Sequence, residues 1–124
     1  MLDILRRVIQ EVNAARDLTS ALNIIVDRVQ TTMGTQACTV YLKNEDDSRY
    51  VFMATRGLNQ SAVGSVSLSV DEGLVGYVGQ RAEPVNLENA TRHPRYLFVE
   101  AVGEEPFKAF LGVPIIHHRK VLGV

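Results

Sequence analysis

The polar residues with the clearest chemical meaning lie between an expected strand and a short helix spaced by glycines. Residues 65–70 alternate serine with valine or leucine, which is typical of a strand with one buried face. Asp71, Glu72 and Gly73 end this pattern, and an apolar helical turn follows at 74–79. Acids at the start of a helix suit its unpaired N–H groups and its dipole. The stretch holds no nucleophile paired with a base, so it indicates binding and regulation rather than catalysis.

The histidines and the single cysteine are the candidates for metal or redox chemistry. His93, His117 and His118 have no cysteine or carboxylate at metal-ligand spacing, so we expect surface or turn positions for them. A phosphate or partner contact and a metal site are the alternatives. Cys38 lies on the apolar face of an expected strand, where cysteine is typically a small buried residue rather than a redox switch. We therefore expect no catalytic residue, no metal and no cofactor.

Composition places the chain among small globular domains. Its 124 residues suit one domain, with 46% hydrophobic and 22% charged residues. The net charge of −1 gives no general attraction to nucleic acid or to an anionic membrane. No apolar run approaches the roughly 20 residues of a membrane span, and the acidic, amphipathic N-terminus is not typical of a targeting peptide. A single cysteine fits a reducing compartment, so we expect a cytoplasmic protein.

Helical periodicity predicts two helices ahead of the strands. The first lies within residues 1–16 and has an apolar stripe of Leu2, Leu5, Val8, Ile9 and Val12. The second begins near Asp17 or Thr19 and ends at about Met33, before Gly34. Two interpretations of the first helix stay open. It pairs with a copy of itself in a homodimer, or it packs on its own domain.

Alternation and turn residues predict the strands. Residues 37–43 and 50–56 form a hairpin around a polar turn, and residues 65–70 add a third strand. The remaining expected elements are an edge strand at 84–87, a helical turn within 95–102, a strand at 108–116 that Pro114 bulges or confines to an edge, and the start of a last strand at 121–124. This order gives an α+β domain around an antiparallel sheet. Since the sequence stops within the last strand, we expect a C-terminally incomplete sheet with an open pairing edge.

Two motifs resemble landmarks of the GAF domain family, and the likeness extends over essentially the whole chain. They are SVSLSVDEGLVGYVGQRAEPVNLENATRHPRY at 65–96 and FKAFLGVPIIHHRKVLGV at 107–124. With YLKNEDDSRYVFMATRGLN at 41–59, they also resemble one branch of that family. This branch is the N-terminal GAF domain of nitrogen-branch enzyme I, the phosphoenolpyruvate–protein phosphotransferases of the PtsP type.

The resemblance implies a fold and a role that the residues alone do not. It implies a twisted antiparallel sheet of about six strands, with two N-terminal helices on one face and a ligand cup on the other. Residues 17–124 form the core of a single GAF domain, which here lacks a completed C-terminal strand and helix. In proteins of this type the GAF domain is regulatory and senses nitrogen status through glutamine and 2-oxoglutarate. Phosphotransferase domains follow it, and a catalytic histidine there passes phosphate from phosphoenolpyruvate to a carrier protein.

The expected ligand is a small metabolite of the glutamine or 2-oxoglutarate class. The motifs of the cyclic-nucleotide branch are not recognisable, and Cys38 does not match the bilin-anchoring cysteine of phytochromes. Asp71 and Glu72 either begin the helix or present a carboxylate to the cup beside the N–H of Gly73. Because two acids oppose an anion at a helix N-terminus, the second interpretation favours glutamine.

Further candidate contacts are spread over the expected strands and turns. They are Tyr41, Met53 and Thr55 on the hairpin, Asn86 on the edge strand, and Arg92, Tyr96 and Phe98 on the segment that covers the cup. Arg92 and Arg95 either close over a carboxylate or lie in solvent. The alternative to a sensor is an interaction module with a vestigial cup, which dimerises through its N-terminal helices.

Overall fold

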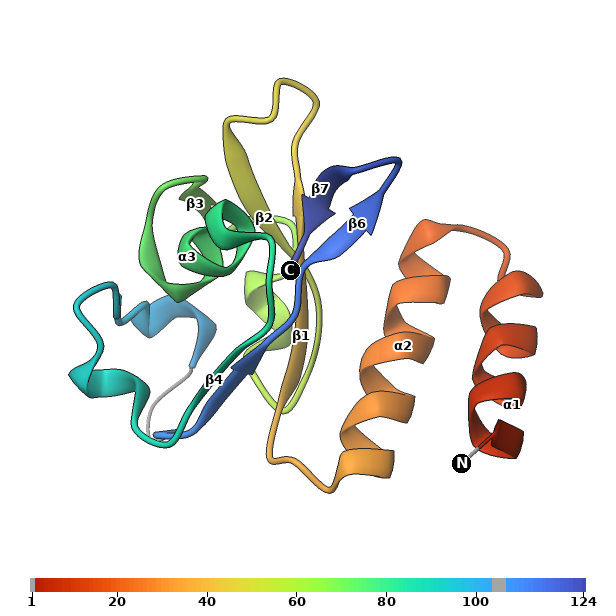
Figure 1. The fold of residues 1–124 in the computed structure, drawn as a ribbon. Coiled ribbons are helices and arrows are strands. Elements are labelled where there is room, and N and C mark those ends of the chain that lie inside the picture. The colour runs from red at the N-terminus through yellow and green to blue at the C-terminus, as the bar shows by residue number, and fades with distance from the viewer. Residues whose placement is uncertain (1, 104–106) are drawn as a thin grey trace.

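The structure is a computed structural model that describes residues 2–103 and 107–124, without the side chains of residues 2, 4, 5, 8 and 12. Two N-terminal helices lie on one side of an antiparallel sheet, and a short helix with several loops lies on the other side (Figure 1). Among the described residues, no helix is both long enough and apolar enough to cross a membrane.

Both N-terminal helices form where the sequence predicts them. Helix α1 is Leu2–Asn13, and helix α2 is Leu18–Met33. Asp17 begins α2, because its carboxylate accepts a hydrogen bond of 2.8 Å from the Ser20 N–H. Gly34 ends α2 in the left-handed conformation, and its N–H donates to the Gln30 carbonyl at 2.9 Å. The two end signals read from the sequence are therefore confirmed.

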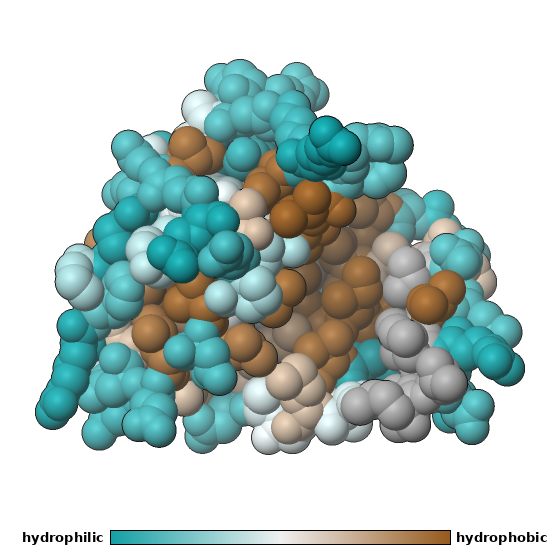
Figure 2. Space-filling model, in the orientation of Figure 1, coloured by the Kyte–Doolittle hydropathy of each residue, from teal (hydrophilic) through white to brown (hydrophobic). Residues whose placement is uncertain are grey.

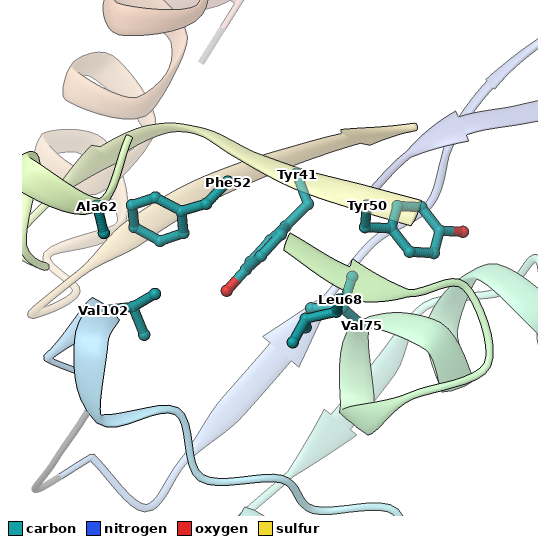
Figure 3. Close-up of a cluster of buried hydrophobic side chains, with 7 residues drawn as sticks. All are labelled: Tyr41, Tyr50, Phe52, Ala62, Leu68, Val75 and Val102. Atoms are coloured by element: carbon teal, nitrogen blue, oxygen red, sulfur yellow. The ribbon is translucent and has the colours of Figure 1, made fainter. Parts of the chain in front are cut away.

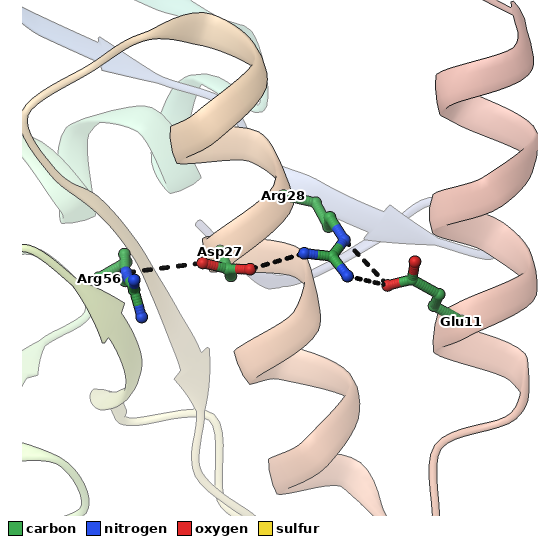
Figure 4. A network of polar contacts seen from close by, with 4 residues as sticks. All are labelled: Glu11, Asp27, Arg28 and Arg56. Carbon is green, nitrogen blue, oxygen red and sulfur yellow. Dashed lines mark hydrogen bonds and ion pairs between the residues drawn. The ribbon is translucent and has the colours of Figure 1, made fainter.

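Helix α1 packs on α2, and α2 packs on the sheet (Figure 1). A chain of charged groups joins these layers: Arg28 of α2 contacts Glu11 of α1 at 2.9 Å and Asp27 at 2.8 Å, and Asp27 contacts Arg56 at 3.5 Å (Figure 4). All four side chains are partly exposed, so the network contributes more to the alignment of the two helices with the sheet than to stability. Of the predicted stripe on α1, only Ile9 has a described side chain, and it is half exposed. Dimerisation through α1 stays a prediction.

The main sheet has five strands in the order β3-β2-β1-β7-β6, all paired antiparallel. Its strands are β1 (Cys38–Lys43), β2 (Arg49–Arg56), β3 (Ser67–Ser69), β6 (Ile115–His117) and β7 (Lys120–Gly123). A separate two-stranded sheet pairs β4 (Val85–Leu87) with β5 (Phe110–Gly112). The predicted α+β class with an antiparallel sheet is confirmed, although the seven strands divide between two sheets.

Two segments differ from the sequence-based expectation. The strand expected at 108–116 is two strands, because Pro114 has no N–H to donate and the chain passes there from the small sheet to the large one. The helical turn expected within 95–102 is confined to a 3₁₀ turn at Glu100–Val102, with irregular backbone before it. Two other 3₁₀ turns lie at Gln60–Ala62 and Ala90–Arg92.

Each face of the β1–β2 hairpin buries its own apolar cluster. The helix-side cluster lies beneath α2 and consists of Leu22, Val26, Val40 and Ala54, with Ile25, Cys38, Leu42 and Met53 packed against it. The second, here named the strap-side cluster, consists of Tyr41, Tyr50, Phe52, Ala62, Leu68, Val75 and Val102 (Figure 3). Phe52 and Val102 are fully buried within it. The hairpin is therefore the shared wall of both cores.

Apolar side chains of the β6–β7 hairpin also remain exposed. Ile115, Ile116 and Leu122 are each exposed by 38–48%. The surface view shows apolar side chains around a recess between this hairpin and the helices (Figure 2). An apolar surface of this kind is available for contact with further protein.

The carboxylate at the start of α2 makes stability depend on pH. Its hydrogen bonds to Ser20 lower the pKa of Asp17 from the ordinary value of 3.8. This contribution to stability is therefore present above pH 3.8 and is lost as the pH falls through the lower pKa of the folded state. Asp17→Asn keeps an N-cap acceptor but does not titrate in this range. Urea unfolding between pH 2 and 6 should show a smaller acid loss for Asp17→Asn than for wild type. Parallel pH profiles would contradict this role of Asp17.

Candidate functional site

The candidate site lies on the face of the sheet opposite α2, where helix α3 (Gly73–Arg81) packs against β2 and β3. A Cβ on Gly76 would lie 2.8 Å from the Val70 carbonyl oxygen, and one on Gly79 would meet the Tyr50 hydroxyl. Only glycine allows this approach, since the backbone carbonyl cannot move aside. The sequence predicted a close approach to a sheet or a ligand. The structure places Gly79 against Tyr50 of the sheet, and Gly76 against the turn between β3 and α3.

Residues 93–103, here named the strap, pass over the N-terminal end of α3 and the strap-side cluster. One end is anchored by Val102, which is fully buried in that cluster. Its carbonyl accepts a hydrogen bond of 2.8 Å from the Asn59 N–H, and the Asn59 side chain donates to Ala101 at 3.0 Å. Between the anchored ends, Leu97 and Phe98 are about two-fifths exposed, at 39% and 43%.

Arg95 ties the other end of the strap to α3. Its guanidinium donates to the Asp71 carbonyl at 2.6 Å and to Gln80 Oε1 at 2.8 Å. It also lies 5.6 Å from the centre of the Tyr77 ring, within the range of a cation–π contact. His93 packs on the same ring at 4.7 Å, and its Nδ1 accepts from the Arg95 N–H at 3.0 Å. Arg95 therefore does not lie free in solvent.

The predicted hairpin contacts fall on two different faces. Tyr41 lies in the strap-side cluster with its ring edge-on to Phe52 (Figure 3). Thr55 is buried, and its hydroxyl bonds the Thr39 hydroxyl across the hairpin at 2.9 Å. Met53 packs against the helix-side cluster instead. The grouping of Met53 with Tyr41 was therefore wrong, because a bulge in the β1–β2 pairing after Val40 shifts the alternation.

The two acids before α3 hold the turn that precedes it. The Glu72 carboxylate accepts from the Ser69 N–H at 2.8 Å, and the Asp71 carboxylate accepts from the Ser69 hydroxyl at 2.6 Å. Glu72 occupies the N-cap position of α3, but its side chain makes no capping hydrogen bond to the helix. Gly73 follows with a positive φ of 67° and lies beneath Leu97. The structural interpretation is thus right in position, but these carboxylates bond the preceding strand.

The other predicted contacts are dispersed. Asn86 is exposed on the separate small sheet, opposite Leu111. Arg92 is exposed at the end of a 3₁₀ turn. Tyr96 and Phe98 lie on the strap, the first half-buried and the second exposed. The structure therefore brings Tyr41, Gly73 and the strap residues to one face of the sheet, and places Asn86 outside it.

Metal and thiol chemistry find little support in the described part of the chain. Residues 2–103 and 107–124 contain no group of three or more His, Cys, Asp and Glu side chains that could hold a metal ion. Burial raises the pKa of the Cys38 thiol, which disfavours the reactive thiolate. Burial, together with the nearby charge of Asp47, likewise raises the pKa of Tyr50. His117 and His118 pack on each other at the β6–β7 turn, 3.9 Å between ring centres.

Sequence reasoning missed Tyr77 and Gln80, which receive the strap on α3. They lie three residues apart on one helix, so their side chains emerge on the same face. Arg81, four residues from Tyr77, also lies over its ring, at 5.5 Å. The signal that could have revealed them is a polar and aromatic face on an otherwise apolar helix, which indicates a contact partner.

Comparison with known proteins decides the family. The family model described as GAF domain matches residues 17–124. The chain belongs to the GAF domain family. It is 47% identical to the GAF domain of an Acinetobacter phosphoenolpyruvate-protein phosphotransferase. That match covers 98% of this chain and 72% of the Acinetobacter chain, and the two structures superpose with a TM-score of 0.86. The corresponding domain from Coxiella burnetii is 44% identical, with 98% and 73% covered and a TM-score of 0.91.

A curated relative extends the comparison beyond single domains. The phosphoenolpyruvate-dependent phosphotransferase system protein of Escherichia coli (strain K12) is 48% identical over 121 residues. These residues are 98% of this chain but only 16% of that protein. The chain therefore corresponds to one GAF domain within a much longer relative.

The close approach of α3 makes Gly76 a sensitive position. In Gly76→Ala, the new methyl group has to displace the backbone near Val70, so we expect a loss of about 2–3 kcal/mol in the free energy of unfolding. Ala82→Gly at the end of the same helix is the control, because Ala82 has a positive φ of 53°. It should leave stability unchanged or raise it by up to ~1 kcal/mol. Urea unfolding of both variants measures this, and an unchanged stability of Gly76→Ala would contradict the packing described.

Proposed function

We propose that this GAF domain is the regulatory, small-molecule-sensing domain of a phosphoenolpyruvate–protein phosphotransferase. The observation that supports this most strongly is the 44–47% identity over 98% of the chain to two GAF domains of such enzymes. On this proposal, the chain itself has no transferase activity. Phosphotransferase domains belonging to the same cytoplasmic protein carry out the chemistry.

The geometry supports a binding role for the face beneath the strap. This face combines an apolar wall with the hydroxyl of Tyr41, as small-molecule sites commonly combine apolar and polar groups (Figure 3). The strap over it is held by Arg95 at one end and by Val99 and Val102 at the other, and it exposes Leu97 and Phe98 between them. A cover with a partly exposed middle suits a site that opens to a ligand.

We propose a carboxylate-bearing metabolite of nitrogen metabolism as the ligand, with glutamine and 2-oxoglutarate as the two sources to distinguish. Arg95 lies beside this face and is a suitable partner for a carboxylate. The preference for glutamine rested on acidic groups aimed at the ligand. Since the carboxylates of Asp71 and Glu72 both bond Ser69, they support that preference less than the sequence suggested.

A second candidate is an interaction module whose cup holds no ligand. The dense strap-side cluster and the exposed apolar side chains Ile115, Ile116 and Leu122 favour it. Pairing through α1 is a separate version, for which exposed Ile9 is the described candidate. Light scattering distinguishes pairing through α1 from pairing through the other apolar side chains. If α1 mediates pairing, Ile9→Asp should convert a dimer to a monomer. A wild-type monomer at all concentrations would contradict dimerisation.

Thermal unfolding with added metabolites tests the sensing function. A ligand that binds only the folded state should stabilise it by about 2.7 kcal/mol at a concentration 100 times its Kd. We expect L-glutamine or 2-oxoglutarate at millimolar concentration to raise the Tm. L-asparagine, one methylene shorter, and glutarate, which has a methylene in place of the keto group, are the matched controls. No shift with either metabolite, or equal shifts with the controls, would overturn the proposal.

A further inference from the structure

We propose that Arg95 is a latch that holds the strap closed, and that a ligand carboxylate releases it by binding its guanidinium. The carboxylate part rests on the proposed sensing function, whereas the latch itself does not. The anchor at Arg95 consists of the contacts of one charged side chain, which another molecule can replace. The anchor at Val102 combines hydrogen bonds from Asn59 with an apolar side chain that is buried in a packed cluster.

The contacts of Arg95 reach both ends of α3. The Asp71 carbonyl lies just before the helix begins, and Gln80 lies in its last turn. The Tyr77 ring between them supports the guanidinium plane. A lysine side chain cannot reproduce this arrangement, because it ends in one ammonium group rather than a planar fork. One side chain thus fixes where the strap crosses α3.

The hydrogen-bond acceptors of Arg95 are groups that a ligand carboxylate can replace. The Asp71 carbonyl and the Gln80 amide oxygen are both uncharged. A carboxylate forms shorter, charge-assisted hydrogen bonds with a guanidinium and can accept two in parallel, which makes it roughly twice as strong a partner. Arg95 is half-buried, so this difference is less weakened by solvent than at a fully exposed site. A carboxylate that reaches it should therefore displace both acceptors.

If the contacts of Arg95 break, the strap should uncover one part of the described core. The strap crosses Gly73 through Leu97 and then enters the cluster through Val102. Movement of its middle would uncover the N-terminal end of α3 and the side of the cluster that contains Tyr41. The hairpin itself is held from its other face by the helix-side cluster, so it should stay folded.

Hydrogen–deuterium exchange of the whole chain tests the latch without any ligand. Arg95→Ala should raise amide exchange at residues 95–98, where the Tyr96 N–H bonds the His93 carbonyl, by about tenfold through local opening, and leave β2 unchanged. Arg81→Ala is the matched control. Arg81 lies over the same Tyr77 ring but bonds Glu83 on its own segment. Equal exchange at 95–98 in the two variants, or an equal rise in β2, would overturn the latch.

Thermal shift with L-glutamine and 2-oxoglutarate as the probes tests release by a carboxylate. Gln80→Ala loosens the latch but keeps Arg95, so it should lower the half-saturating concentration at least ~3-fold. Arg95→Ala should raise that concentration tenfold or more, because the carboxylate loses its partner. A wild-type response in Arg95→Ala would overturn release by a carboxylate. If neither probe stabilises wild type, the sensing function fails, and the exchange experiment still decides the latch.

Discussion

The structure depends on the close approach of α3 to the turn after β3 at Gly76 and to the sheet at Gly79. Without side chains at these positions, the helix lies against the Val70 carbonyl and the Tyr50 hydroxyl. This contact brings Val75 into the strap-side cluster and presents Tyr77 and Gln80 outward, where Arg95 reaches them. A side chain at Gly76 would move α3 away from the turn at Val70 and Asp71, and would disturb the cluster and the strap together.

Local signals were sufficient for the elements whose ends are fixed by a single residue. Asp17 and Gly34 bound α2 through their own backbone and side-chain hydrogen bonds, so the sequence alone predicts them. The alternation at 66–70 likewise predicts which side chains of that segment face the core, with Leu68 buried. Glycine spacing in 73–79 predicted a close approach, although not whether a sheet or a ligand would be the neighbour.

Features that depend on distant partners could not be predicted in the same way. The bulge after Val40 depends on pairing with β2, and it moved Met53 to the helix side. Pro114 was expected to bulge a strand or to confine it to an edge, but the separate pairing of β5 with β4 makes it the boundary between two sheets. The direction of Arg95 depends on Asp71 and Gln80, which lie 24 and 15 residues away in the sequence, and no periodicity reveals such contacts.

Different physical features identify the family and select the ligand. Core patterning and the glycine positions make the domain recognisable, because they determine how the chain packs. A ligand is selected by a few polar groups, and in the site we propose those groups lie on the strap and α3. NMR titration of backbone amides with L-glutamine and 2-oxoglutarate tests binding at this face most directly. We expect one of them to shift resonances of Gly73, Arg95 and the strap while those of α1 and α2 stay constant. Shifts confined to α1 and α2, or no shifts with either metabolite, would contradict this account.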